Sequence, residues 1–463
     1  MKNYIYIIMC CALLLSSCKT YKGLYQKYER PEVNTQGLIR DAKSDTDTLV
    51  VSDTTTLGST PWRQVFTDPK LQALIDTALV NNTDLLTAAL SVRQVEATLQ
   101  MAKLAFVPSF VFAPTGTLRS WDGTKVSKTY DLPIKASWTI DLFGNLTNAK
   151  RAQQVALIQS RDHQRAVRTA IISNVANCYY TLLMLDEQMR ITKETEILAR
   201  DTWEKMKDMK EYNSFNEASV LSAKANYLSV QASIPELERQ IREVENSLCL
   251  LMSSAPQHID RGTFTNQALP TDLRTGVGIQ LLANRPDVHA KEMALAQCFY
   301  NVNKARAAFY PNITITASAA WTNSGGAGIV NPGKILANAI SSLTQPIFMN
   351  GRLQSDLRVA KAEQEKAFLA WQQSISNAGS EVSNALKLYE TSARRSQLEA
   401  ERTITLAQNV EVAQQYMSMG GTYLEVIAAQ QGLLASQLTK VSDDFQKMQA
   451  VVNLYYALGG GQE

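Results

Sequence analysis

Two uninterrupted helical stretches constrain this sequence more than any other feature. Residues 145–212 are 68 residues without glycine or proline, and residues 352–419 are another 68 with only one glycine. Within each stretch apolar residues recur at alternating steps of four and three, which is typical of helices that pack along their length. At 1.5 Å per residue each helix would be roughly 100 Å long. A globular core cannot cover such a helix, so we expect these helices to pack side by side.

A strand-like segment precedes each long helix. Apolar and polar residues alternate strictly from Tyr130 to Leu142, which is the pattern of a β-strand with one apolar and one polar face. The segment from Leu343 to Phe348 before the second long helix is also strand-like. Polar residues that we expect to face a water-filled channel are Asp131, Lys135 and Asp141.

The order of elements is the same in both halves, which indicates an internal duplication. Pro108 and Pro311 each stop a helix and lie 203 positions apart, as do Asp84 and Asp287 near the helix starts. The first repeat is predicted at residues 61–253, with a β-hairpin at 109–143, a long helix at 145–212 and a return helix at 217–253. The second is predicted at 279–461, with a helix at 287–309, a hairpin at 312–348, a long helix at 352–419 and a return helix at 422–458. Residues 254–278 are predicted to form the linker between the repeats.

The amino terminus has the pattern of a bacterial lipoprotein signal. A lysine precedes an apolar run that ends in Leu15-Ser16-Ser17-Cys18, which resembles a lipobox. We therefore expect residues 1–17 to be removed and Cys18 to be acylated. The polar residues 18–60 are predicted to form an extended tether with little regular structure.

Composition excludes several classes of function. The net charge of +3 is too small to indicate nucleic-acid binding. The sequence contains no nucleophile motif, phosphate loop or metal-ligand spacing, so we expect neither an enzyme nor a bound cofactor or metal. The three cysteines outside the signal and lipid site are expected to be buried small apolar residues; they are Cys178, Cys249 and Cys298.

The number of strands points to an oligomer. Each chain supplies four long strands, and an open sheet of four cannot exist in a bilayer, where every backbone group must be paired. Eight strands give a barrel filled by side chains, whereas twelve leave room for a channel. We therefore expect a trimeric membrane β-barrel.

Several motifs together resemble the bacterial outer-membrane efflux proteins of the TolC/OprM type, in particular the acylated drug-efflux lipoproteins. The matching stretches are 62–79, Arg285-Pro286-Asp287, residues 304–311, Asp141-Leu142-Phe143-Gly144, Gln345-Pro346-Ile347-Phe348 and Ala457-Leu458-Gly459-Gly460-Gly461. The resemblance implies a mainly α fold in a homotrimer: a 12-strand β-barrel in the outer membrane, continued by a 12-helix α-barrel in the periplasm. It also implies two partners, a periplasmic adaptor and an inner-membrane efflux pump.

The same resemblance places the candidate functional residues at the periplasmic tips of the helices, where the tube narrows. The tip residues that we single out are Tyr212, Asn213 and Phe215 in the first repeat, and Tyr416, Gly420, Gly421, Leu424 and Glu425 in the second. Leu424 matches an apolar ring at the constriction, whereas Ala428 stands where family members often carry an aspartate. A plain glycine turn is the structural alternative for these tips.

Besides an outer-membrane exit duct for small toxic molecules, the sequence leaves two other functions open. One is the outer-membrane duct of a protein-secretion system, which would share the fold. The other is a periplasmic coiled-coil adaptor lipoprotein without a pore, although adaptors carry one helical hairpin rather than two.

Overall fold

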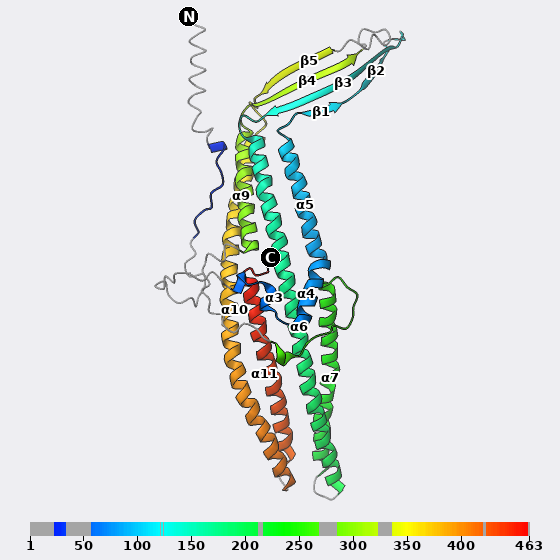
Figure 1. Ribbon diagram of the computed structural model, residues 1–463, viewed down its shortest axis with the longest axis vertical. Helices are drawn as coiled ribbons and strands as arrows, with labels where there is room; N and C mark the ends of the chain where they lie inside the picture. Colours follow the sequence, from blue (N-terminus) through cyan, green and yellow to red (C-terminus); the bar gives the residue numbers. More distant parts are fainter. Residues whose placement is uncertain are drawn as a thin grey trace. The chain divides into compact units, whose positions relative to one another are not determined.

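The structure analysed is a computed structural model, and it divides into two compact units (Figure 1). It describes residues 23–33, 57–120, 122–123, 125–211, 216–267, 285–322, 336–419 and 423–461. Unit 1 consists of residues 1–33, 90–162 and 289–373, and unit 2 of residues 34–89, 163–288 and 374–463. Four helices contribute residues to both units: α5 (Thr83–Leu104), α6 (Asn145–Glu211), α9 (Pro286–Ala307) and α10 (Arg352–Ser418).

Unit 1 contains one antiparallel five-stranded sheet, drawn at the top of Figure 1. Its strands are β1 (Ser109–Phe112), β2 (Thr115–Arg119), β3 (Ser127–Ile140), β4 (Asn312–Thr322) and β5 (Leu336–Thr344). The central pair joins the two repeats, with Leu132 of β3 opposite Trp321 of β4. Apolar side chains on β3, such as Ile134 and Trp138, are exposed in the single chain. The sheet therefore presents apolar surface that this chain does not cover.

Both predicted hairpins are longer than the strands that form. The first strand is broken into β1 and β2 around Ala113-Pro114, because proline has no N–H to donate to the ladder. The last strand, β5, ends at Thr344 rather than at Phe348, two residues before Pro346. The hairpins of the two repeats thus differ at their outer strands.

Part of the predicted tether, residues 23–33, has little regular structure but packs against the helices of unit 1. Leu24 is only 2% exposed, and its carbonyl accepts a hydrogen bond from the Asn148 side chain of α6 at 2.8 Å. Arg30 forms an ion pair with the buried Glu292 of α9 (Pro286–Ala307), its Nε lying 2.8 Å from the carboxylate. We call residues 23–33 the strap, because they bind elements of both repeats within unit 1.

The corner between β3 and α6 is closed by Asp141 and Gly144. The Asp141 carboxylate accepts hydrogen bonds from the backbone of Leu146 and Thr147, at 3.1 and 2.7 Å, in the first turn of α6. Asp141 therefore lies one residue after the strand and caps a helix, rather than lying within the strand as predicted. Gly144 has a φ of +78°, and a Cβ there would lie 3.2 Å from the Tyr25 ring of the strap. The corner thus needs a glycine both for its backbone and for the strap.

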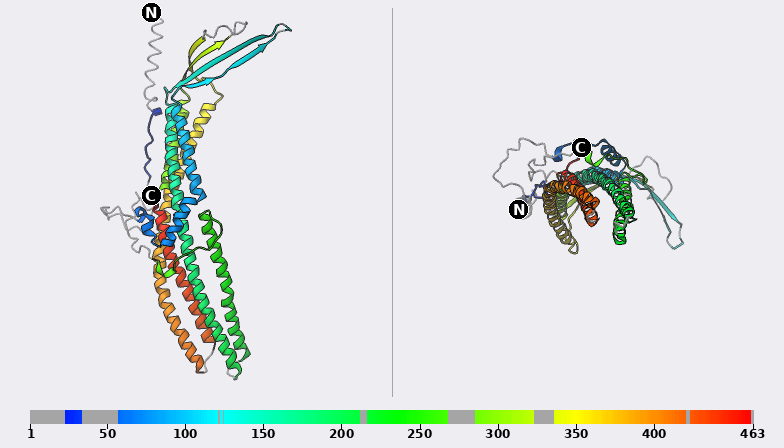
Figure 2. Two further views of the ribbon diagram at one scale, coloured as in Figure 1. Left: turned by 45° about the vertical axis from the view of Figure 1, so that its right-hand side comes forward. Right: turned by 90° about the horizontal axis from the view of Figure 1, so that it is seen from below.

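Unit 2 is helical, and helices of equal length recur in the two halves of the chain. α6 and α10 each have 67 residues. Their return helices, α7 (Glu217–Leu251) and α11 (Tyr423–Ala457), each have 35 residues, and α5 and α9 each have 22. Both views in Figure 2 place α7 alongside α6 and α11 alongside α10. Pro235 lies inside a continuous α7.

The core of unit 2 lies where short segments pack against the long helices. Besides α6, α7 and α11, it includes α3 (Trp62–Val65) and α4 (Pro69–Asn81), and its fully buried side chains include Phe66, Leu71, Tyr179 and Tyr455. The described half of the predicted linker 254–278 also belongs to this core, because Ile259 and Phe264 are buried in it. Arg261 secures this segment through ion pairs with Asp186 and Glu245. This stretch is therefore a structural element rather than a free linker.

Candidate functional site

The helix tips are described only in part. Tyr212, Asn213, Phe215, Gly420 and Gly421 lie outside the described residues. Tyr416 near the end of α10 is 50% exposed. Asn216 caps the start of α7, its side chain accepting a hydrogen bond from the backbone of Ser219 at 2.9 Å.

The first turns of α11 have two distinct faces. Val426, Ile427 and Ala429 are buried against neighbouring helices. Leu424 is 58% exposed, and Glu425 and Ala428 are exposed as well. Leu424 and Ala428 lie four residues apart and so share one face of the helix. An exposed leucine therefore stands one turn from an exposed alanine, with an acid beside the leucine.

Two small apolar clusters hold the buried face in place. One contains Met206, Val220, Ala223 and Ile427, from α6, α7 and α11. The other contains Val410, Ala413, Val426 and Ala429, from α10 and α11. The start of α11 is thus packed against both helix pairs of unit 2.

Two hydrogen bonds join α11 to the first repeat. Gln430 donates from Nε2 to Thr202 Oγ1 of α6 at 2.9 Å, and Gln430 is almost fully buried. Gln431 donates to Asn226 Oδ1 of α7 at 2.8 Å. The sequence analysis missed all four side chains, because no periodicity indicates which polar residues of separate helices meet. A buried glutamine that loses its partner is costly, so these bonds favour the packed arrangement.

The contact between α10 and α11 contains a polar seam. Ser396 donates to Asp444 Oδ1 at 2.6 Å, and Ser436 donates to Glu399 Oε2 at 2.9 Å and lies 3.0 Å from Thr403 Oγ1. Asp443 is completely buried, and Arg395 Nη2 lies 3.1 Å from its carboxylate. Burial raises the pKa of Asp443, and Glu399 and Asp444 add to this effect against the opposing charge of Arg395.

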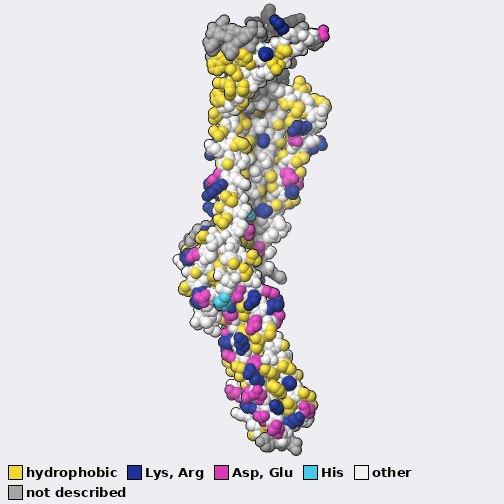
Figure 3. Space-filling view, turned by 90° about the vertical axis from the view of Figure 1, so that its right-hand side faces the viewer, with side chains coloured by type: hydrophobic (Ala, Val, Ile, Leu, Met, Phe, Trp, Pro, Cys, Tyr) yellow, Lys and Arg dark blue, Asp and Glu magenta, His cyan; other side chains and the backbone are white. Residues whose placement is uncertain are grey.

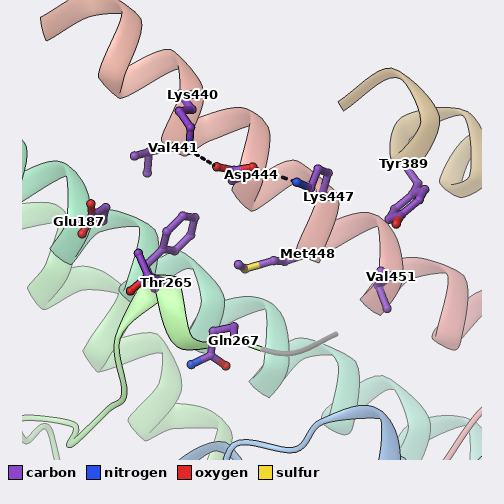
Figure 4. Close-up of a pocket in the computed structure, with 11 residues that line it drawn as sticks. Glu187, Thr265, Gln267, Tyr389, Lys440, Val441, Asp444, Lys447, Met448 and Val451 are labelled. Carbon is purple, nitrogen blue, oxygen red and sulfur yellow. Dashed lines mark hydrogen bonds and ion pairs between the residues drawn. The ribbon is translucent and has the colours of Figure 1, made fainter. Parts of the chain in front are cut away.

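A groove of about 390 Å³ opens beside this seam and is shown in Figure 4. Asp444, Lys440 and Lys447 of α11 lie along one wall, joined by hydrogen bonds of 2.9 and 3.0 Å. Glu187 of α6 lies across from them, and Val441 and Met448 supply apolar surface. Charges of both signs are already paired here, and the described lining residues include no nucleophile with an adjacent base.

The two remaining predicted channel residues lie within β3. Asp131 is opposite Thr322 of β4, and Lys135 is opposite Val111 of β1 and Ser318 of β4. Lys135 is exposed, as is its neighbour Ile134 on the other face of the strand. The alternation of these side chains follows from the strand itself, whereas the face that meets water stays a prediction.

The described part of the chain has neither a cluster of metal-binding side chains nor a membrane-spanning helix. No group of three or more His, Cys, Asp and Glu side chains there could hold a metal ion. No helix in that part is long and apolar enough to cross a membrane. Acidic and basic side chains are interspersed over the lower half of the face in Figure 3, without a large area of one sign.

Comparison with known proteins defines the class. Two stretches, residues 74–254 and 278–460, match the family model described as "Outer membrane efflux protein". The chain is 28% identical to the "Cation efflux system protein CusC" of Escherichia coli (strain K12) over 469 residues, which covers 98% of each chain. It is 26% identical to the "Solvent efflux pump outer membrane protein SrpC" of Pseudomonas putida over 408 residues, covering 86% of this chain and 87% of SrpC.

Solved structures show the same fold. A crystal structure of CusC superposes with a TM-score of 0.84 at 26% sequence identity, covering 94% of this chain and 99% of CusC. The outer-membrane channel OprN superposes with a TM-score of 0.85 at 21% identity, covering 95% and 99% of the two chains. A helix, a β-hairpin, a long helix and a return helix, occurring twice and sharing one sheet, are therefore the fold of an outer-membrane channel of the TolC type. The chain belongs to the outer membrane efflux protein family, which confirms the resemblance in its motifs and places it in the outer membrane.

Proposed function

We propose that this protein is a homotrimeric exit duct through which a tripartite efflux system releases small toxic molecules. The proposal rests on the sheet, whose two edges have no partner strand among the described residues, and on the family to which the chain belongs. Within the described sheet β5 pairs only with β4, and β1 and β2 pair only with β3. Unpaired edges are not viable in a bilayer, so further copies must supply the missing partners. Three copies would close a twelve-strand barrel wide enough for a channel.

The duct is passive in this proposal. A periplasmic adaptor and an inner-membrane pump supply cargo and energy, and Cys18 anchors the chain through acyl groups. The printed names of the relatives include cation efflux for CusC and solvent efflux for SrpC, at similar identities of 28% and 26%. These relatives support export of small molecules rather than proteins, without favouring one cargo.

The proposed gate lies at the start of α11. Three exposed Leu424 side chains, one from each copy, would form an apolar constriction that resists hydration. The hydrogen bonds of Gln430 and Gln431 would hold α11 in the closed arrangement.

Replacement of Leu424 tests the gate. Three carboxylates in the ring would repel one another and attract water, so Leu424→Glu should raise the single-channel conductance of the protein in planar bilayers. Cells that carry this variant should become more sensitive to antibiotics normally excluded by size. Glu425→Ala is the matched control at the neighbouring exposed position and should have a smaller effect. Unchanged conductance in a correctly assembled Leu424→Glu protein would place the constriction elsewhere.

A further inference from the structure

Basic side chains gather where the helices of unit 1 meet its sheet. The strands are antiparallel, so the four connections lie at one end of the sheet: α5 to β1, β3 to α6, α9 to β4, and β5 to α10. Within seven residues of these connections the helices carry seven basic residues and one acidic residue, Asp356. The basic residues are Lys103, Lys150, Arg151, Lys304, Arg306, Arg352 and Arg358. We call this set the basic collar.

Helix dipoles explain the positions of only some of the positive charges in the basic collar. Lys103, Lys304 and Arg306 lie in the last turns of α5 and α9, where the negative end of the dipole favours cations. Arg352 begins α10, and Lys150 and Arg151 lie in the second turn of α6, where a positive charge is not favoured. Neither α6 nor α10 has an acidic residue in its first turn, although the Asp141 carboxylate caps the first turn of α6. The charges at these two helix starts therefore need another explanation.

Few of these charges are neutralised within the chain. Arg352 lies 3.7 Å from Asp356, a distant pair in which both side chains are exposed. Arg306 donates to the neutral side chain of Asn303, and Arg151 donates to the Tyr25 carbonyl of the strap. Lys150 lies over the Phe106 ring. None of the last three contacts supplies a negative charge.

The strap places the collar close to the lipid anchor. The carbonyls of Leu24 and Tyr25 bind Asn148 and Arg151 in the first two turns of α6. Gly23 follows Cys18 by five residues, which can span at most about 18 Å. The backbone of Cys18 must therefore lie within about 18 Å of Gly23, the neighbour of the Leu24 that binds the first turn of α6. The intervening sequence contains two lysines, Lys19 and Lys22, whereas the basic and acidic residues of the strap balance each other.

The surface next to the collar is apolar, as expected at the edge of a bilayer. Ile347 and Phe348, between β5 and α10, are 97% and 80% exposed. Val107, between α5 and β1, is 56% exposed. Apolar side chains that border a ring of cations match the boundary between acyl chains and headgroups.

We propose that the basic collar binds anionic phospholipid headgroups of the leaflet that holds the Cys18 acyl groups. The barrel and the Cys18 acyl groups of the proposed duct would hold the chain in the membrane, and cations at the level of the headgroups add attraction to anionic lipids. Each cation near an anionic surface strengthens binding by about fivefold. This inference rests on the proposed function, because it assumes that the sheet is in the membrane and that Cys18 is acylated.

The test measures which lipid the protein retains. Purified full-length protein is placed in neutral detergent with equal amounts of phosphatidylglycerol and phosphatidylcholine, and the lipids retained after gel filtration are quantified by mass spectrometry. The wild type should retain more phosphatidylglycerol. The variant Lys103→Gln, Lys304→Gln, Arg306→Gln, Arg352→Gln should lower the ratio of the two lipids at least about fivefold.

Matched variants separate the collar from general charge. Replacing Lys193, Lys205, Lys207 and Lys210 of α6 in unit 2 with Gln removes the same charge and should leave the ratio unchanged. The charge-preserving set Lys103→Arg, Lys304→Arg, Arg306→Lys, Arg352→Lys should retain the wild-type ratio. If the four-site Gln variant does not assemble, the two-site variant Lys103→Gln, Lys304→Gln should still lower the ratio.

Three results would overturn the inference: equal retention of both lipids by the wild type, equal ratios in the collar and control variants, or displacement of phosphatidylglycerol by inorganic phosphate. The intact mass of the purified protein reports acylation of Cys18 separately. A mass without acyl groups would contradict the anchoring part of the proposed function, whatever the lipid ratio.

Discussion

Asp443 and Asp444 are neighbours on α11 with opposite surroundings. Asp444 accepts hydrogen bonds from Ser396, Lys440 and Lys447, whereas neither Asp443 oxygen has a hydrogen-bond donor among the described residues. Burial alone would raise the pKa of Asp444. The hydrogen bonds from Ser396, Lys440 and Lys447 have the larger effect, so the pKa of Asp444 is lowered. The pKa of Asp443 is raised, so its ionised form opposes folding.

Replacing each of these aspartates with Asn should therefore give opposite results. Asp444→Asn removes charge-assisted hydrogen bonds and should lower the free energy of unfolding by about 1–3 kcal/mol. Asp443→Asn removes a buried charge and should be neutral or stabilising at pH 8. Thermal unfolding of both variants in the same detergent is the measurement. A loss of stability in Asp443→Asn as large as that in Asp444→Asn would contradict this account of the seam.

His289 gives unit 1 a pH-dependent contact. Its Nδ1 lies 2.6 Å from the buried carboxylate of Asp162 on α6. The hydrogen bond with Asp162 raises the pKa of His289, and the charges of Asp162 and Glu292 add to this, while burial and Arg30 oppose it. A raised pKa means that the charged form stabilises the fold below about pH 6.5, and that this contribution is lost as pH rises through the folded-state value.

We expect the melting temperature of the wild type to fall more between pH 6 and pH 9 than that of His289→Gln. The difference should correspond to about 1 kcal/mol, because the histidine is partly exposed and solvent screens the pair. Circular dichroism melts at several pH values measure it. Parallel pH profiles for the two proteins would show that this pair does not contribute.

At the scale of elements, β3 offers adjacent residues with opposite expected environments. Ile134 pairs with Phe112 of β1 and Ala319 of β4. Its neighbour Lys135 pairs with Val111 of β1 and Ser318 of β4. Ile134→Arg should impair membrane insertion by up to ~2–4 kcal/mol, depending on its depth in the bilayer. Lys135→Arg should be tolerated. The yield of heat-modifiable, detergent-stable protein from outer membranes measures insertion, and equal losses at both positions would refute the assignment of faces.

At the scale of the whole molecule, the open edges of the sheet determine how the protein exists in a membrane. We predict trimers by native mass spectrometry in a detergent that preserves related channels, because three copies supply the twelve strands of a channel-forming barrel. A change within an edge strand, such as Ser342→Pro in β5, should reduce trimers without melting the helices of unit 2. A wild-type protein that is only monomeric under these conditions would argue against the duct.

The sequence by itself determined the helices and their duplication. Helix lengths depend on local properties, namely apolar periodicity and the absence of glycine and proline, and these can be read from one stretch at a time. The predicted long helices at 145–212 and 352–419 each differ by one residue from α6 and α10. The β-hairpins were less well predicted at their outer strands, because Pro114 and Pro346 interrupt patterns that alternation alone extends.

Only the tertiary structure decided which polar side chains meet. Arg30 and Glu292 are 262 positions apart, and Gln430 and Thr202 are 228 apart. Asp141 follows the alternation of a strand yet caps a helix, and Asp443 has the sequence context of a solvated helix face yet is completely buried. Local patterns carry no information about such partners, because burial and hydrogen bonding depend on which helices the fold brings together. The strap, the polar seam and the bonds that hold α11 therefore came from the structure.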